Sequence, residues 1–99
     1  MRLSKQQQKI IHDEVGRFFG EQARVKLFGS RLDDTKKGGD IDLLIELPEK
    51  PDEMVKKELN LNARLIQLLG DQKIDLLLVF PGIELAPVHR HAQQTGVTL

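Results

Sequence analysis

The sequence predicts an α+β fold in which helices cover a small mixed β-sheet. Three observations support this prediction: two long segments carry helix caps and helical spacing, residues 40–47 alternate between apolar and polar, and residues 73–80 form a further, largely apolar strand. The elements follow in the order helix, strand, strand, helix, strand, helix. The distance between the last two strands suits the crossover that parallel strands require. We expect residues 1–99 to form one domain, since this length is close to that of a typical single domain.

Composition excludes several classes of protein. Hydrophobic residues make up 39% of the chain and charged residues 30%, values ordinary for a globular protein and unlike a disordered one. The 15 Lys and Arg residues balance the 15 Asp and Glu residues, so we expect no direct nucleic-acid binding. The absence of cysteine excludes disulfides, thiolate zinc sites and cysteine nucleophiles.

The sequence also lacks membrane and export signals. Segment Met1–Lys9 is polar, unlike a signal peptide, and apolar runs such as Leu76–Phe80 are far shorter than the roughly 20 residues that span a bilayer. We therefore expect a soluble cytoplasmic protein without membrane contact.

The first two elements are a helix and a strand. Ser4 is a suitable N-cap for the helix, and Gly20 stands where the helix is expected to end. The apolar face between them consists of Ile11, Val15, Phe18 and Phe19. Segment Arg24–Phe28 alternates charged and apolar residues, which predicts a short strand with Val25 and Leu27 turned inward.

A loop and the clearest strand follow. Glycines and aspartates punctuate residues 29–39, which predicts a loop with room for one helical turn. Segment Asp40–Leu47 is the clearest predicted strand of the sequence. One of its faces carries Asp40, Asp42, Leu44 and Glu46, and the other carries Ile41, Leu43, Ile45 and Leu47.

The next helix is expected to begin at an Asp52 cap and to run to Leu69, with Gly70 ending it. Its predicted apolar stripe is Met54, Leu61, Leu65 and Leu68. Further aliphatic residues, including Leu59, Ile66 and Leu69, widen the apolar surface beyond one stripe. Such a surface suits contact with a partner protein or with a second copy of the chain.

The last third of the chain contains a strand, a helix and a tail. Segment Lys73–Phe80 is apolar apart from Asp75 and is predicted to be a strand. The final helix is expected over about Leu85 to Gln94, where Pro87 falls in the first turn and is tolerated there. Segment Gly96–Leu99 is expected to be a short tail.

Three aspartates are candidate metal ligands. Asp40 and Asp42 leave the same face of a predicted strand, about 6.5–7 Å apart at their Cα atoms. The crossover places Asp75 in the same sheet, where an unpaired carboxylate is costly to bury. Carboxylates on neighbouring strands are the ligands that hard cations such as Mg²⁺ prefer. The alternative is that Asp40 and Asp42 are simply solvent-facing and that Asp75 stands at an exposed strand entrance.

The pair Gly29–Ser30 is the second part of the candidate site. It follows the first strand directly, where glycine permits close approach of a phosphate and a serine hydroxyl can hold its oxygens. The run Leu27–Arg31, together with Gly39–Ile45, resembles the signature of the DNA polymerase beta-like nucleotidyltransferase superfamily. Segment Lys73–Leu77 is similar to its minimal nucleotidyltransferases, which are often antitoxin partners of HEPN-domain ribonuclease toxins.

This resemblance implies a nucleotidyltransferase fold and a set of functional roles. Asp40, Asp42 and Asp75 would be the catalytic residues and would hold Mg²⁺, with two ions expected. The nucleotide and its phosphates would be bound by Gly29, Ser30 and Arg31, with Lys36 and Lys37 as further positive charges.

By the same resemblance, the chain would transfer AMP from ATP to a hydroxyl group of a HEPN-type toxin, most simply a tyrosine. It would then be an antitoxin that acts as a protein adenylyltransferase. Two alternatives stay open at this stage: a non-catalytic module that neutralises a toxin by masking it, and the catalytic subunit of a small-molecule nucleotidyltransferase.

Overall fold

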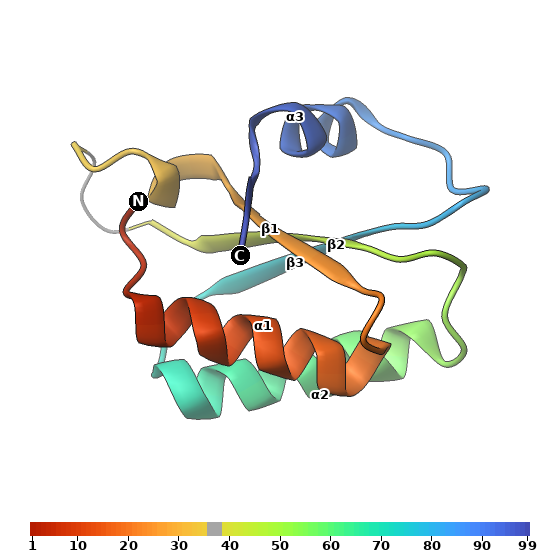
Figure 1. Cartoon of the computed structure of the whole chain (residues 1–99), viewed down its shortest axis with the longest axis horizontal. Helices are drawn as coiled ribbons and strands as arrows, with labels where there is room; N and C mark the ends of the chain where they lie inside the picture. Colours follow the sequence, from red (N-terminus) through yellow and green to blue (C-terminus); the bar gives the residue numbers. More distant parts are fainter. Residues whose placement is uncertain (36–38) are drawn as a thin grey trace.

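The computed structural model describes residues 1–35 and 39–99 and places a four-stranded sheet between two helical layers (Figure 1). Helices α1 and α2 lie side by side against one face of the sheet, and α3 lies over the other (Figure 1). In chain order the elements are α1 (Lys5–Phe19), β1 (Arg24–Phe28), the 3₁₀ turn η1 (Gly29–Leu32), β2 (Ile41–Glu46), α2 (Met54–Leu69), β3 (Ile74–Val79), α3 (Pro87–Thr95) and β4 (Val97–Thr98). The expected α+β class and the mixed sheet are confirmed.

The strand order is β3-β2-β1-β4, so β2 is an inner strand with a partner on each side. It pairs with β1 in antiparallel and with β3 in parallel orientation. The parallel pair is connected through α2, as the crossover argument requires. The residues Ile41, Leu43 and Ile45 of this inner strand are fully buried, because α1 and α2 cover the sheet face to which they point.

The C-terminal segment differs from the expected tail. Val97 pairs with Leu27 and Thr98 pairs with Lys26, which makes β4 an additional edge strand beside β1. The Leu99 amide extends this pairing by donating to the Val25 carbonyl at 3.0 Å. Two residues are too few to show a strand periodicity, so only the free edge of β1 could reveal this pairing.

Helix boundaries follow the expected punctuation with one exception. Ser4 caps α1 and forms a capping box with Gln7, and Gly20 and Gly70 follow the last residues of α1 and α2. The expectation that Asp52 caps α2 is wrong. Helix α2 begins two residues later, after Glu53, whose φ of 51° is left-handed and whose side chain makes no capping bond.

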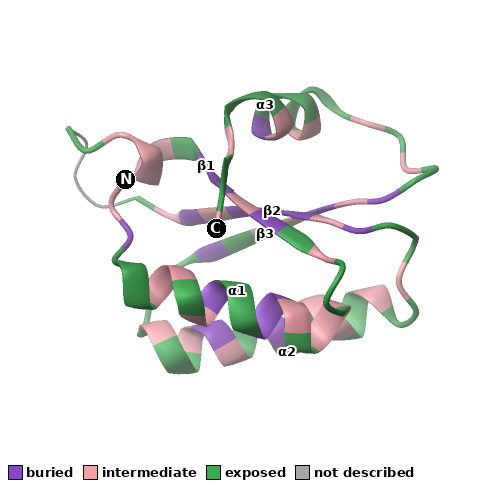
Figure 2. Ribbon diagram, in the orientation of Figure 1, coloured by how far each residue is buried: buried purple, intermediate pink, exposed green. Residues whose placement is uncertain are grey.

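The main core lies between the sheet and the helices α1 and α2, where buried residues turn toward the strands (Figure 2). Leu61 and Leu65 of α2 are fully buried, but Leu68 is 39% exposed, contrary to the predicted stripe. The stripe continues instead through Leu69, which packs against the core from the same side of the helix. A smaller cluster of Phe28, Leu44 and Ala92 fills the space under α3.

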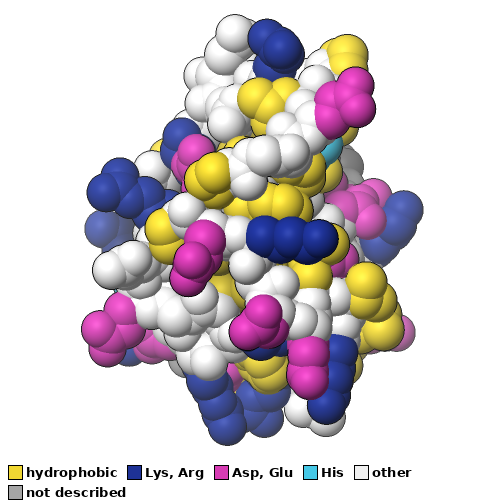
Figure 3. Space-filling view, turned by 90° about the vertical axis from the view of Figure 1, so that its right-hand side faces the viewer, with side chains coloured by type: hydrophobic (Ala, Val, Ile, Leu, Met, Phe, Trp, Pro, Cys, Tyr) yellow, Lys and Arg dark blue, Asp and Glu magenta, His cyan; other side chains and the backbone are white. Residues whose placement is uncertain are grey.

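Within the described ranges, no helix combines the length and the apolar character that crossing a membrane requires. The view in Figure 3 shows Lys and Arg side chains interspersed with Asp and Glu and with hydrophobic residues. This mixed surface agrees with the balance of 15 basic and 15 acidic residues in the sequence.

Replacing a core leucine of α2 tests this packing. We expect Leu65→Ala to lower the free energy of unfolding by about 2–5 kcal/mol, because it removes buried methyl groups and leaves a cavity. Leu59→Ala on the same helix is the matched control. Its side chain is 66% exposed, so we expect a change within about 0.5 kcal/mol. Urea unfolding measures both values, and equal losses would contradict the orientation of α2.

Candidate functional site

The sheet register brings the end of β1 beside the beginnings of β2 and β3. Phe28 is paired with Asp42, and Asp42 is paired with Asp75, so these residues form one row across the sheet. Chain residues Gly29 and Ser30 follow Phe28 directly and form the start of η1. The structure therefore brings together four of the predicted site residues: Gly29, Ser30, Asp42 and Asp75.

Gly29 is in direct contact with the Asp42 carboxylate. Its φ of +80° is left-handed, and a Cβ atom at this position would collide with Oδ2 of Asp42. A side chain on residue 29 would therefore force Asp42 out of its place, in addition to straining the backbone. This contact gives the glycine of the Gly29–Ser30 pair a second role beside phosphate approach: it makes room for the carboxylate.

Gly39 has the same relation to Ser30. Its φ is +94°, and a Cβ on residue 39 would collide with the Ser30 hydroxyl oxygen. The Ser30 side chain thus packs on the backbone that leads into Asp40 and β2. No pattern in the sequence predicts this contact. A glycine before the first aspartate was its only local signal, and the partner is nine residues away.

Asp40 forms an ion pair with a lysine. It precedes β2, which begins at Ile41 rather than at Asp40, and its Oδ2 lies 3.6 Å from Nζ of Lys73. Both groups of this ion pair remain largely accessible, with side chains 43% and 70% exposed. In residues 1–35 and 39–99, no three His, Cys, Asp or Glu side chains are arranged to hold a metal ion.

The Asp42 carboxyl has a raised pKa and therefore holds its proton more tightly than a free aspartate does. Partial burial raises the pKa of Asp42, and the charge of Asp75, a hydrogen bond with it and the charge of Asp40 raise it further. Lys73 acts in the opposite direction. A carboxylate that is partly removed from water beside a second carboxylate gains strongly from a cation between them.

These observations fit a divalent cation held by oxygen ligands. Asp42 and Asp75 form an adjacent carboxylate pair, and the missing Cβ of Gly29 keeps space open for one of them. Asp40 lies two residues before Asp42, and its Oδ2 contacts Lys73. The donor set is therefore of the kind that Mg²⁺ and Mn²⁺ prefer.

Arg31 lies within the η1 turn, and its guanidinium already donates hydrogen bonds to three partners. Its guanidinium donates to the Gln72 side-chain oxygen at 2.6 Å, to the Arg2 carbonyl at 3.0 Å and to the Gly39 carbonyl at 3.4 Å. Its role in phosphate binding stays a prediction. Lys36 and Lys37, the other predicted positive charges, lie outside the described residues. The contacts of Arg2 and Gln72 had no signal in the sequence, because they join segments far apart in the chain.

A hollow of about 390 Å³ adjoins the acidic pair, between α2 and the outer edge of β3. Asp75 is part of its wall, together with apolar and polar residues of both elements. Leu59, which is 66% exposed, contributes to the same hollow. A second molecule could therefore reach Asp75 from this side.

Comparison with known families gives one match. A family model described as a nucleotidyltransferase domain matches residues 8–94. A search of curated proteins finds none that matches the chain. The matched range contains Gly29, Ser30 and all three aspartates, and it begins after the N-terminal segment that contacts Arg31.

A pair of glycine variants tests the contact with Asp42. We expect Gly29→Ala and Gly70→Ala each to lower the free energy of unfolding by about 1 kcal/mol, because both glycines have positive φ. Only Gly29→Ala should also weaken Mn²⁺ binding, by roughly tenfold or more, since nothing lies within 4 Å of a Cβ at Gly70. Urea unfolding and electron paramagnetic resonance of Mn²⁺ measure the two effects. Equal Mn²⁺ affinities of the two variants would contradict the position of the Asp42 carboxylate against Gly29.

The raised pKa of Asp42 predicts a pH-dependent effect of Asp42→Asn. The folded state binds the Asp42 proton more tightly than the unfolded state, so ionisation of this group costs stability as pH rises through its folded pKa. Without metal, the asparagine variant should therefore have the higher Tm at pH 7, by roughly 2–5 °C, and the difference should shrink toward pH 4. Thermal unfolding in EDTA tests this, with the exposed Asp71→Asn as control. A Tm difference between Asp42→Asn and the wild type that does not change with pH would contradict the raised pKa of Asp42.

Proposed function

The chain belongs to the nucleotidyltransferase domain family, and from this premise we propose that it transfers AMP from ATP to a tyrosine hydroxyl of a HEPN-type ribonuclease toxin and so acts as its antitoxin. The observation that carries the proposal is the Asp42–Asp75 carboxylate pair beside the Gly29–Ser30 turn. The resemblance to minimal nucleotidyltransferases supports the choice of nucleotide and partner. The proposed location is the cytoplasm, where ATP and Mg²⁺ are both present.

The proposed nucleotide site is the turn after β1. The Ser30 hydroxyl would donate to a phosphate oxygen, and the absence of a side chain on Gly29 would let the triphosphate approach the backbone. Arg31 would contribute positive charge close to the pyrophosphate, while its hydrogen bonds hold the turn in place. By holding the terminal phosphates, these groups would orient the α-phosphate for attack.

The proposed metal ligands are Asp40, Asp42 and Asp75. When bound there, Mg²⁺ would neutralise phosphate charge and increase the acidity of the attacking hydroxyl. Asp42 is the inner ligand of this set, because it is partly buried between Gly29 and Asp75. Asp40 would exchange its contact with Lys73 for the metal.

The proposed role of Asp75 is to receive the acceptor. It is exposed, in contrast to the partly buried Asp42, so an incoming hydroxyl can reach its carboxylate. In the transfer, the hydroxyl proton passes to Asp75, the hydroxyl oxygen bonds to the α-phosphorus, and the bond from that phosphorus to the departing pyrophosphate breaks. The hollow beside Asp75, with the exposed Leu59 in its wall, supports an acceptor that belongs to another protein.

Masking without catalysis is the second candidate function. It is favoured by the Asp40–Lys73 ion pair, which occupies one of the three proposed ligands. In this alternative the chain neutralises its partner by covering it, and the carboxylates are not required.

Transfer of radiolabel tests the proposal. We expect α-labelled ATP with Mg²⁺ to label the cognate helical partner, and the Asp40→Asn/Asp42→Asn double variant to lose at least 99% of this transfer, because the metal ligands are gone. Asp71→Asn, an exposed aspartate in the loop before β3, should keep it. Gel autoradiography and tandem mass spectrometry identify the labelled residue.

Two other outcomes of this experiment would replace the proposed function. A tight complex without label, together with full neutralisation by Asp42→Ala, would replace catalysis by masking. Label on a metabolite rather than on protein would identify a small-molecule nucleotidyltransferase.

A further inference from the structure

We propose that Arg2 is a positioning residue that holds the Gly29–Ser30 turn in the orientation required for ATP binding. This inference rests on the proposed function for its catalytic consequence. It concerns the segment before residue 8, which lies outside the range matched by the family model. Arg2 therefore lies outside the residues that the family model matches.

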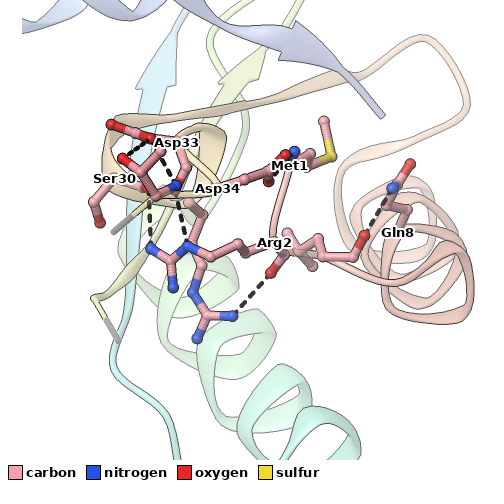
Figure 4. A network of polar contacts seen from close by, with 9 residues as sticks. Met1, Arg2, Gln8, Ser30, Asp33 and Asp34 are labelled. Carbon is pink, nitrogen blue, oxygen red and sulfur yellow. Dashed lines mark hydrogen bonds and ion pairs between the residues drawn. The ribbon is translucent and has the colours of Figure 1, made fainter. Parts of the chain in front are cut away.

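Arg2 donates hydrogen bonds to the backbone of the turn (Figure 4). Its Nη2 donates to the Ser30 carbonyl at 3.0 Å, and its Nε donates to the Asp33 carbonyl at 3.0 Å. Its backbone amide donates to the Arg31 carbonyl at 2.7 Å. Three carbonyls of one short turn are thus bound by a single residue that is 28 or more positions away in the sequence.

Arg31 completes the contact in the opposite direction. Its Nη1 donates to the Arg2 carbonyl at 3.0 Å, while its other donors reach Gly39 and Gln72. Gly39 directly precedes Asp40, and Gln72 lies three residues before Asp75. The Arg2–Arg31 pair therefore connects the turn to both chain segments that carry the acidic residues.

The N-terminal segment is itself anchored, so Arg2 has a fixed base. Leu3 is buried in the main core with 6% of its surface exposed. Its carbonyl accepts a hydrogen bond from Gln8 at 3.0 Å, and Ser4 caps α1 directly after it. A side chain that starts from an anchored backbone loses less freedom when it forms hydrogen bonds.

These contacts determine the position of the Ser30 hydroxyl. The Ser30 carbonyl accepts from Arg2 and also from the Asp33 amide at 3.1 Å, which fixes the plane of the peptide. The hydroxyl then stays against Gly39, where it is placed for a phosphate in the proposed function. Without Arg2 the turn must be ordered during ATP binding, and affinity falls accordingly.

Arg2→Met tests the inference, with Arg24→Met as the matched control. Arg24 is exposed at the opposite end of β1 and undergoes the same chemical change. For Arg2→Met we expect faster hydrogen exchange in residues 29–33 and about tenfold weaker binding of Mg²⁺–ATP by titration calorimetry, with kcat at saturating ATP changed less than threefold. Arg2→Lys should be intermediate, since one ammonium group cannot reach both carbonyls in the geometry of a guanidinium.

Two results would overturn the inference. One is an exchange rate in residues 29–33 and an ATP affinity within twofold of the wild type for Arg2→Met. The other is faster exchange spread evenly over the sheet with ATP affinity unchanged, which indicates general stabilisation only. If the wild type binds no ATP and transfers no label, the proposed function fails. The exchange pattern of Arg2→Met still decides whether Arg2 holds the turn.

Discussion

The register of β2 between its two neighbours is the constraint on which the rest of this structure depends. It pairs Asp42 with Phe28 on one side and with Asp75 on the other. Side chains alternate along a strand, so a shift of β2 by one residue would move Asp42 to the face packed by α1 and α2, away from Asp75. The fully buried residues Ile41, Leu43 and Ile45 oppose that shift, because it would remove all three from the main core. Hydrophobic burial on one face of β2 thus fixes the acidic pair on the other.

The acidic pair carries a cost in the metal-free protein. Asp42 is partly removed from water and stands beside a second carboxylate, and both effects raise its pKa. A sheet designed for stability alone would place an uncharged residue there. The close contact with Gly29 adds a further constraint, because the glycine backbone is the only one that leaves room for the carboxylate. Such local conflicts are typical of functional sites.

The residues around this pair form a connected support. Arg31 reaches from the turn to Gly39 and Gln72, and Arg2 holds the turn from the N-terminal side. The open hollow along α2 and β3 leaves Asp75 accessible on the remaining side. The arrangement is held by hydrogen bonds at the proposed nucleotide site and is open at the proposed acceptor site, as a transfer between two separate molecules requires.

Local sequence determined most of the secondary structure. Ser4, Gly20, Gly70 and Pro87 act within one helical turn, and the alternation in β2 reflects the geometry of a single strand, so these elements were predictable. The carboxylate pairing was inferred only because a crossover connection forces two strands into parallel alignment. Strand β4 depends on the edge that β1 leaves free, and the exposure of Leu68 depends on which side of α2 meets the sheet. Neither leaves a local pattern.

The sequence by itself therefore determined which residues are candidates for the chemistry: Gly29, Ser30 and three aspartates at spacings that local geometry makes meaningful. Only the tertiary structure decided how they are used. It directs Asp40 toward Lys73, places Ser30 against Gly39 and brings Arg2 onto the turn. The physical reason is that these contacts are made through space between distant segments. Their energies depend on the packing of the whole chain and not on neighbouring residues.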